Sequence, residues 1–322
     1  MERIAAVLLV GALALAAPAA AEDAYPSRPI IMIVPFAPGG STDAIGRIVA
    51  EGLRQVLGRP VVVENRAGAG GSIGTAAIAK APPDGYTIGM GTASTLAINP
   101  AVYKSLAFDV VDDLVPIGNV AEVPNIMSVN PSVETSDIAA FIDFARAHPG
   151  EFSYASAGNG SVSHLLGEQF KQATGADIVH VPYKGIGPAL TDVVGGQVQL
   201  VYDNLPTSLP LVESGSLRPL AVSGEARIAA LPDVPTFAEA GLEDMNWMAF
   251  FGLVAPEGTP ASVVRKLSEA LAEALALPQV NDKLVAQQAI VVGNSPEAFK
   301  AQIAHELARM RRAAAAAKIQ LD

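Results

Sequence analysis

The chain has 322 residues, is half hydrophobic and carries a formal net charge of −11. A chain of this length buries a large core and can form two domains, and its acidic balance argues against nucleic acid or an anionic membrane as a partner. It contains no cysteine, which excludes disulfides, thiolate metal sites and cysteine nucleophiles. Its four histidines are scattered without metal-ligand spacing, so we expect neither a metal nor another cofactor.

The N-terminus has the three regions of a secretory signal peptide. Glu2 and Arg3 precede an apolar run over residues 4–17, and the small residues that end at Ala21 favour cleavage after that position. The apolar run is shorter than the ~20 residues that span a bilayer. We therefore expect residues 1–21 to direct export and to be removed, with a retained N-terminal anchor as the alternative.

The first predicted unit of the mature chain is a strand, a glycine loop and a helix. Residues 30–34 form an unbroken apolar run, which is typical of a strand buried on both faces of a parallel sheet. Two prolines and two glycines follow, and Ser41 is placed to cap the next helix. Unpaired N–H groups at a helix N-terminus bind anions. Residues 36–43 are therefore a candidate carboxylate or phosphate site, with an ordinary strand-to-helix turn as the alternative.

The rest of the chain continues to alternate strands and helices. Strand-like runs lie at residues 60–64 and 84–91, and a second glycine loop that contains Arg66 lies between them. This alternation indicates an α/β fold with parallel, doubly wound sheets. Six further strands are predicted, at residues 126–129, 152–155, 178–181, 200–202, 217–222 and 248–254.

Two extended crossings, near residues 120–126 and 245–251, divide the chain into two predicted domains. The chain is expected to leave the first domain at one crossing and to return to it at the other. Domain 1 then consists of residues 22–126 and 245–322, and residues 127–244 form an inserted domain 2.

A weak internal repeat favours a site between these domains. The segments that begin at Ala37 and at Ala157 share Ala, Gly and Ser in register, and each joins a strand to a helix. If the two loops face each other across a cleft, they hold a ligand carboxylate from both sides.

Polar side chains near these loops are further candidates, each with a structural alternative. Arg66 could pair with a ligand carboxylate or with Glu64, and His164 could donate to a ligand or pack at the start of its helix. Tyr183 offers a hydroxyl group. Asp203 ends a predicted strand, where parallel sheets present site residues, or else it caps a turn.

A secreted serine hydrolase is the alternative function. Ser72 lies in a G-x-S-x-G pattern, but residues 65–69 separate it from the preceding strand, whereas a nucleophile elbow needs its serine directly at the strand end. Ser161 with His164 is the other possible catalytic pair.

Several longer motifs occur in order along nearly the whole mature chain. They are the segments at residues 35–43, 63–71, 84–87, 99–100, 156–164, 181–185, 203–206 and 231–236. Together they resemble the Bug family, the extracytoplasmic solute-binding proteins of tripartite tricarboxylate transporters. One departure is that Phe250 and Phe251 precede the Gly-Leu of the return strand, where the family commonly has an aromatic residue, often Trp; Trp247 lies earlier.

The resemblance implies a type II-like periplasmic-binding-protein fold of two α/β domains with the ligand cleft between them. It also implies a periplasmic, non-enzymatic and monomeric receptor that passes a di- or tricarboxylate or an aromatic carboxylate to transporter membrane subunits. The ligand-binding residues expected from the loops and from the resemblance are Phe36, Ala37, Pro38, Gly39, Gly40, Ser41, Asp43, Arg66, Thr92, Ser94, Ser156, Ala157, Gly158, Gly160, Ser161, His164, Tyr183 and Asp203.

Overall fold

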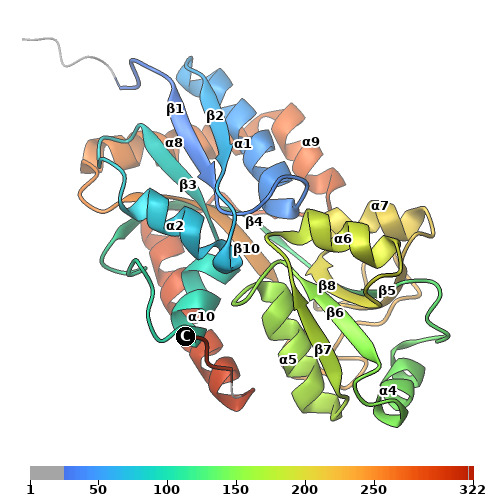
Figure 1. Ribbon diagram of the computed structural model, residues 1–322. Helices are drawn as coiled ribbons and strands as arrows, with labels where there is room; N and C mark the ends of the chain where they lie inside the picture. The colour runs from blue at the N-terminus through green and yellow to red at the C-terminus, as the bar shows by residue number, and fades with distance from the viewer. Residues whose placement is uncertain (1–24, 318) are drawn as a thin grey trace, which may run out of the picture.

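The computed structural model describes residues 25–317 and 319–322, and the predicted signal peptide lies outside these residues. The chain forms two lobes, each built around one sheet, and strands β4 and β10 run from the first lobe towards the second (Figure 1). The predicted α/β class is confirmed.

The first sheet has the strand order β11-β4-β10-β3-β1-β2. Strands β1, β2 and β3 are parallel, whereas β10 runs antiparallel to both of its neighbours, β3 and β4. The sheet is therefore mixed rather than purely parallel, because the returning chain enters it from the opposite end. Its strands are β1 (Ile30–Val34), β2 (Val61–Asn65), β3 (Thr87–Thr92), β4 (Leu114–Val123), β10 (Ala249–Pro256) and β11 (Ile290–Val291).

Amphipathic helices cover this sheet. In α1, Ile45, Val49 and Leu53 recur at helical spacing and are fully buried, and α1 also packs against α8 and α9. The helices of this lobe are α1 (Ser41–Leu57), α2 (Ser72–Ala79), α3 (Asn99–Val102), α8 (Ala261–Ala276), α9 (Pro278–Ala286) and α10 (Pro296–Ala316), with short helical turns at Ala69–Gly71, Ser94–Ile98 and Glu243–Met245.

The second sheet has the order β7-β6-β8-β5-β9 and is also mixed. Strand β6 is parallel to β7 and β8, whereas β5, the strand that enters this lobe, is antiparallel to β8 and β9. Its elements are β5 (Asn125–Val129), α4 (Ile138–Ala147), β6 (Phe152–Ser156), α5 (Val162–Thr174), β7 (Ile178–Pro182), α6 (Ile186–Val194), β8 (Leu200–Asn204), α7 (Leu205–Glu213) and β9 (Arg218–Val222).

The chain changes sheets at Pro124, the residue between the end of β4 and the start of β5. Proline has no N–H to give to a strand ladder, so it suits a point where one sheet ends. The return path runs from Val222 to Ala249 and includes Trp247. The domain boundaries after residues 126 and 244 stay a prediction.

Candidate functional site

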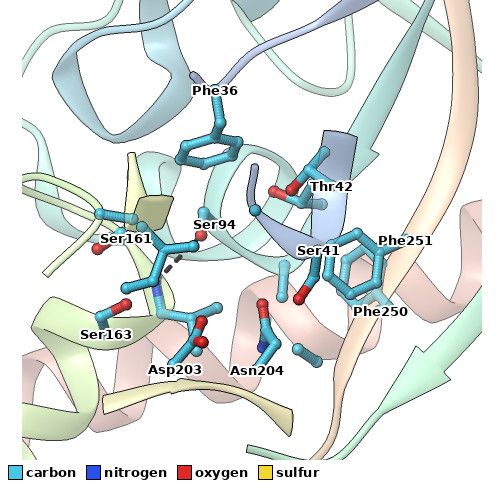
Figure 2. A pocket seen from close by; sticks show the side chains of 17 residues that line it. Phe36, Ser41, Thr42, Ser94, Ser161, Ser163, Asp203, Asn204, Phe250 and Phe251 are labelled. Carbon is cyan, nitrogen blue, oxygen red and sulfur yellow. Dashed lines mark hydrogen bonds between the residues drawn. The ribbon is translucent and has the colours of Figure 1, made fainter. Parts of the chain in front are cut away.

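A cavity of about 30 Å³ lies between the two lobes. Hydroxyl groups from both lobes and aromatic rings from the first lobe surround it (Figure 2), and of the described residues that line it Asp203 is the only ionisable one. The lining residues are Phe36, Gly40, Ser41, Thr42, Thr92, Ala93, Ser94, Ala157, Ser161, Val162, Ser163, Ile186, Asp203, Asn204, Ala249, Phe250 and Phe251.

The structure brings some of the predicted ligand-binding residues to this cavity and places others behind it. The lining residues among them are Phe36, Gly40, Ser41, Thr92, Ser94, Ala157, Ser161 and Asp203. Those that do not line it are Ala37, Pro38, Gly39, Asp43, Arg66, Ser156, Gly158, Gly160, His164 and Tyr183.

The N-terminus of α1 reaches the cavity through Gly40, Ser41 and Thr42. The prediction that Ser41 caps this helix is wrong: extended Gly40 is the N-cap, and Ser41 is the first helical residue. Its hydroxyl instead pairs with the hydroxyl of Thr207, which lies on α7 in the other lobe. No side chain caps α1 at this position, so the first N–H groups of the helix remain suited to an anion.

Asp43 holds this first loop in shape from behind. Its carboxylate accepts hydrogen bonds from the Gly39 N–H (3.2 Å), Arg47 Nε (3.0 Å) and Asn65 Nδ2 (2.9 Å). Asn65 Nδ2 also donates to the Phe36 carbonyl at 3.0 Å. Burial alone raises the pKa of Asp43, but the three hydrogen bonds outweigh it and hold that pKa below its ordinary value. Asp43 is therefore ionised, and its hydrogen bonds hold residues 36–43 in their loop conformation.

The N-terminus of α5 reaches the cavity from the second lobe. Ser161 is its N-cap and accepts a hydrogen bond from the His164 N–H at 3.3 Å. The next N–H, that of Val162, donates to Ser94 Oγ in the first lobe at 3.0 Å. Two helix N-termini, one from each lobe, thus meet at one cavity.

Neutral imidazoles support this second loop. The Gly160 N–H donates to His164 Nδ1 at 3.2 Å, and His180 Nε2 lies 2.6 Å from Ser156 Oγ, which also accepts from the Gly158 N–H. The two rings stack with centroids 4.3 Å apart. Burial lowers the pKa of His164, and burial together with the charges of His164 and Lys171 lowers the pKa of His180 to about 3.

The loops of the two lobes touch directly around the cavity. Tyr103 donates its hydroxyl to the Asn159 carbonyl at 3.1 Å, and a Cβ added to Gly70 would lie 2.1 Å from that same carbonyl oxygen. Gly187 packs similarly closely against the Pro38 carbonyl. Ala37, Pro38 and the glycines of both loops therefore serve this contact between the lobes, where any larger side chain would separate them.

Arg66 and Tyr183 point to partners outside the cavity. Arg66 Nε donates to Glu64 at 2.8 Å, and 43% of its side chain is exposed. Tyr183 donates its hydroxyl to Asp192 at 2.6 Å. The structure thus favours the alternative that the sequence offered for Arg66, a pair with Glu64.

Asp203 is the last residue but one of β8 and lines the cavity beside Asn204 (Figure 2). It is 3% exposed, and its Oδ2 accepts a hydrogen bond from Ser208 Oγ at 2.8 Å. Burial raises the pKa of Asp203 to about 7, against the hydrogen bonds from Ser208 and the Asn204 N–H, which lower it.

Several lining residues were not among the predicted contacts. Thr42 and Asn204 directly follow predicted residues, so a wider reading of each motif would have included them. Phe250 and Phe251 are 2% exposed and form an apolar wall. The sequence pointed to them only through their departure from the family pattern. Ile186 had no comparable signal. The remaining ones are Ala93, Val162, Ser163 and Ala249.

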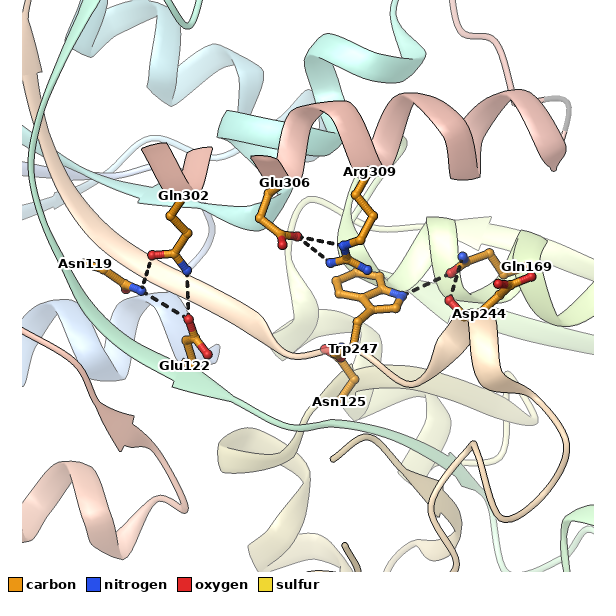
Figure 3. Close-up of polar contacts among 9 residues, drawn as sticks. All are labelled: Asn119, Glu122, Asn125, Gln169, Asp244, Trp247, Gln302, Glu306 and Arg309. Atoms are coloured by element: carbon orange, nitrogen blue, oxygen red, sulfur yellow. Dashed lines mark hydrogen bonds and ion pairs between the residues drawn. The ribbon is translucent and has the colours of Figure 1, made fainter. Parts of the chain in front are cut away.

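Trp247, three residues before Phe250, contacts residues of both lobes (Figure 3). Its carbonyl accepts from Asn125 Nδ2 at 2.6 Å, and its indole Nε1 donates to Gln169 on α5 at 3.3 Å. The Arg309 guanidinium of α10 lies over the indole, 4.9 Å from the ring centre. Asn125 also accepts a hydrogen bond from the cavity residue Asn204 at 2.8 Å. Trp247 thus contacts both lobes and is two hydrogen bonds away from the cavity.

The geometry does not provide the arrangement that a serine hydrolase needs. Ser72 Oγ accepts from Asn99 Nδ2 at 2.9 Å, and Ser161 contacts the backbone of His164 rather than its ring. The nucleophile of such an enzyme is hydrogen-bonded to its base and open to substrate. Ser156 does contact an imidazole, that of His180, but Ser156 is fully buried.

Comparison with known proteins gives relatives along nearly the whole chain. Protein BugT of Bordetella pertussis is 42% identical over 312 residues, which cover 96% of this chain and 95% of that protein. The solved structure of Rhodopseudomonas palustris Rpa4515 with adipate is 38% identical, with a TM-score of 0.88 and coverage of 92% of this chain and 99% of that one.

Two further solved structures differ in whether a ligand is present. MatC from Rhodopseudomonas palustris with bound malate is 31% identical, with a TM-score of 0.87 over 90% of this chain and 99% of that one. A solute-binding protein from Polaromonas without ligand is 29% identical over 90% and 98%, but its TM-score is 0.64. At nearly equal identity, the overall arrangement of this chain is closer to the ligand-bound structure. The solved structure of the periplasmic binding protein BugD, which is 36% identical with a TM-score of 0.89 over 92% of this chain and 99% of that one, confirms the periplasmic-binding-protein fold.

The family described as the tripartite tricarboxylate transporter family receptor matches residues 45–318. Its members are substrate-binding receptors and not enzymes. By this match and by its likeness to BugT, the chain belongs to the family of tripartite tricarboxylate transporter receptors.

Proposed function

We propose that this protein is a periplasmic receptor that binds a small carboxylate between its lobes and presents it to the membrane subunits of a tripartite transporter. Among the ligand classes that the sequence left open, we favour dicarboxylates, because similar proteins were solved with adipate and with malate. We further propose that it acts as a monomer.

The observation that carries this proposal is the meeting of α1 and α5 at one cavity. Each helix brings its N-terminal turn and a serine, Ser41 or Ser161, to the cavity, and the described lining residues include no Lys, Arg or His. Helix N-termini and hydroxyls bind a carboxylate without a cation. Because one helix comes from each lobe, a carboxylate between them stabilises the closed arrangement.

Export follows from the predicted signal peptide, which lies outside the described residues. Within the described part of the chain, no helix is both long and apolar enough to cross a membrane. The predicted signal peptide and the family support the periplasm as the proposed location, where the receptor collects its ligand.

A thermal-shift panel on the chain from residue 22 tests the proposal. We expect adipate, malate or another small carboxylate to raise the melting temperature, because a ligand at 100 times its Kd adds ~2.7 kcal/mol to the stability of the folded protein. The matching amides and neutral sugars are the controls and should leave it unchanged. A panel of dicarboxylates, citrate and aromatic acids that shifts nothing would contradict the proposal.

A further inference from the structure

The cavity combines an acidic side chain with the absence of a counter-charge. Asp203 is buried there, and the described lining residues contain no cationic side chain. A bound dicarboxylate would place further negative charge close to Asp203. Two ionised carboxylates that share a buried site repel each other, so one of them takes up a proton.

Asp203 has no cationic partner among the described residues. None of their ion pairs includes it, and Arg47 pairs with Asp43 and Lys171 with Glu168. The ionisable groups on the packed elements are Asp43, Arg47, Glu51 and Arg54 on α1, Tyr154 on β6, His164, Glu168 and Lys171 on α5, Asp192 on α6, Tyr202 on β8 and Glu213 on α7.

Two neighbouring donors already contact the Asp203 carboxyl group. Ser208 Oγ donates to Oδ2 at 2.8 Å, and the Asn204 N–H is the other donor to this carboxyl group. Figure 2 shows the carboxyl group directed into the cavity, beside Asn204. A proton on this group would therefore point at a ligand held by the two loops.

We propose that Asp203 binds the ligand as a carboxylic acid, so that its O–H donates to one oxygen of the ligand carboxylate. This inference rests on the proposed function. When Asp203 is ionised in the free protein, binding takes up one proton from solvent, which moves onto the Asp203 carboxylate, and no covalent bond of the ligand changes. The site then selects ligands that present an accepting carboxylate to this position.

The pKa of Asp203, raised to about 7 by burial, places this uptake in an accessible pH range. Affinity should level off below pH ~7 and fall by about tenfold per pH unit well above it, as one-proton linkage requires. His164 and His180 stay neutral over this range, because burial lowers the pKa of both.

Calorimetric titration with adipate and with malate between pH 6.5 and 9, in buffers of different ionisation enthalpy, tests the inference. We expect wild-type protein to take up nearly one proton per ligand at high pH. Asp203→Asn keeps a donor, so it should retain affinity at pH 6.5 and lose both the proton uptake and the pH slope. Glu213→Gln, at the far end of α7, is the matched control and should keep both.

Each other outcome is decisive. Wild-type binding without proton uptake would overturn the role of Asp203 and leave the carboxylate receptor intact. If the affinity of Asp203→Asn depends on pH as steeply as that of wild type, the proton is on the ligand, and the proposed role of Asp203 is also overturned. If neither acid nor any other carboxylate in the panel binds at any pH, both proposals fail. The proton uptake of wild-type protein does not depend on whether the variant folds.

Discussion

The two loops that face each other across the cavity, residues 36–43 and 156–164, are similar in sequence and differ in what supports them. In the first loop, the ionised carboxylate of Asp43 accepts hydrogen bonds from the Gly39 N–H, Arg47 and Asn65. In the second, the neutral rings of His164 and His180 hold the Gly160 N–H and Ser156.

The difference shows that one loop geometry can be stabilised by charge or by buried neutral rings. A carboxylate with a lowered pKa keeps its charge through the physiological pH range, whereas an imidazole changes charge close to it. The first loop should therefore be insensitive to pH and sensitive to loss of its charge. The second should respond to acid.

The largest effect is expected from Asp43→Ala. It removes three hydrogen bonds, from the Gly39 N–H, Arg47 and Asn65, although Asn65 keeps its bond to the Phe36 carbonyl. Because a hydrogen bond to a charged group contributes ~1.5–3 kcal/mol, we predict a loss of ~3 kcal/mol in the free energy of unfolding. Urea denaturation measures it, and Glu51→Ala on the exposed face of the same helix serves as the control. A loss equal to that of the control would mean that Asp43 does not hold the loop.

The contact between the lobes is tested by Gly70→Ala. The added Cβ would meet the Asn159 carbonyl oxygen at 2.1 Å and push the second loop away. We expect carboxylate affinity to fall about 100-fold, equivalent to ~2.7 kcal/mol, in calorimetry.

Gly58→Ala is the matched control for this variant. Gly58 has a φ of 65°, close to the 57° of Gly70, but nothing lies within 4 Å of its added Cβ. Both variants bear the strain of a left-handed alanine, ~1 kcal/mol, so both should be slightly less stable. Equal affinities in the two would rule out a role for the Gly70 contact in closure.

Alanine variants of the two cavity serines distinguish the loss of ligand binding from the loss of helix capping. Ser41→Ala and Ser161→Ala should each weaken carboxylate binding by about tenfold, as expected for a lost hydrogen bond to a charged group. Only Ser161 is an N-cap, so only its loss should also lower the unfolding free energy through the helix end, by ~1 kcal/mol. Wild-type affinity in the double variant would show that the loops do not bind through these hydroxyls.

The smallest effect is the acid sensitivity of the second loop. Because the folded state lowers the pKa of both histidines, the unfolded chain binds more protons once pH falls below ~6.5. Stability should therefore be present above that pH and decline below it, by at most ~1.4 kcal/mol per pH unit per imidazole and by less at the partly exposed His180.

His180→Gln tests this sign, because glutamine can still contact Ser156. Urea denaturation between pH 7 and 5 should give a shallower pH slope for the variant than for wild type. The raised pKa of Asp203 acts in the opposite sense, since it favours the folded state as pH falls through about 7, but it is common to both proteins. Identical slopes would show that His180 does not contribute to the acid sensitivity.

Much of the fold could be predicted because its signals are local. The apolar run at residues 30–34 is strand β1 with the predicted bounds, and both sheets contain the predicted series of strands. The antiparallel placement of β5 and β10 was not predicted, because strand direction depends on which end of a sheet the chain enters. That is a property of the path through two lobes.

The site was predictable at the level of loops and not of individual side chains. Both glycine loops reach the cavity, yet Asp43 and His164 lie behind it and Thr42 and Asn204 line it. Adjacent residues in a tight turn point in different directions, so a motif marks the segment without assigning its contacts. Arg66 illustrates the same limit, since Glu64 two residues away satisfies it.

The central claim, that one carboxylate is held from both lobes at once, is tested most directly by following Trp247 during a titration. Trp247 is the only tryptophan and contacts α5 and α10. We expect the preferred carboxylate to change its emission saturably, with the same midpoint as calorimetric binding, while small-angle scattering shows a smaller radius of gyration. A ligand that binds tightly and changes neither the emission nor the scattering would contradict the claim.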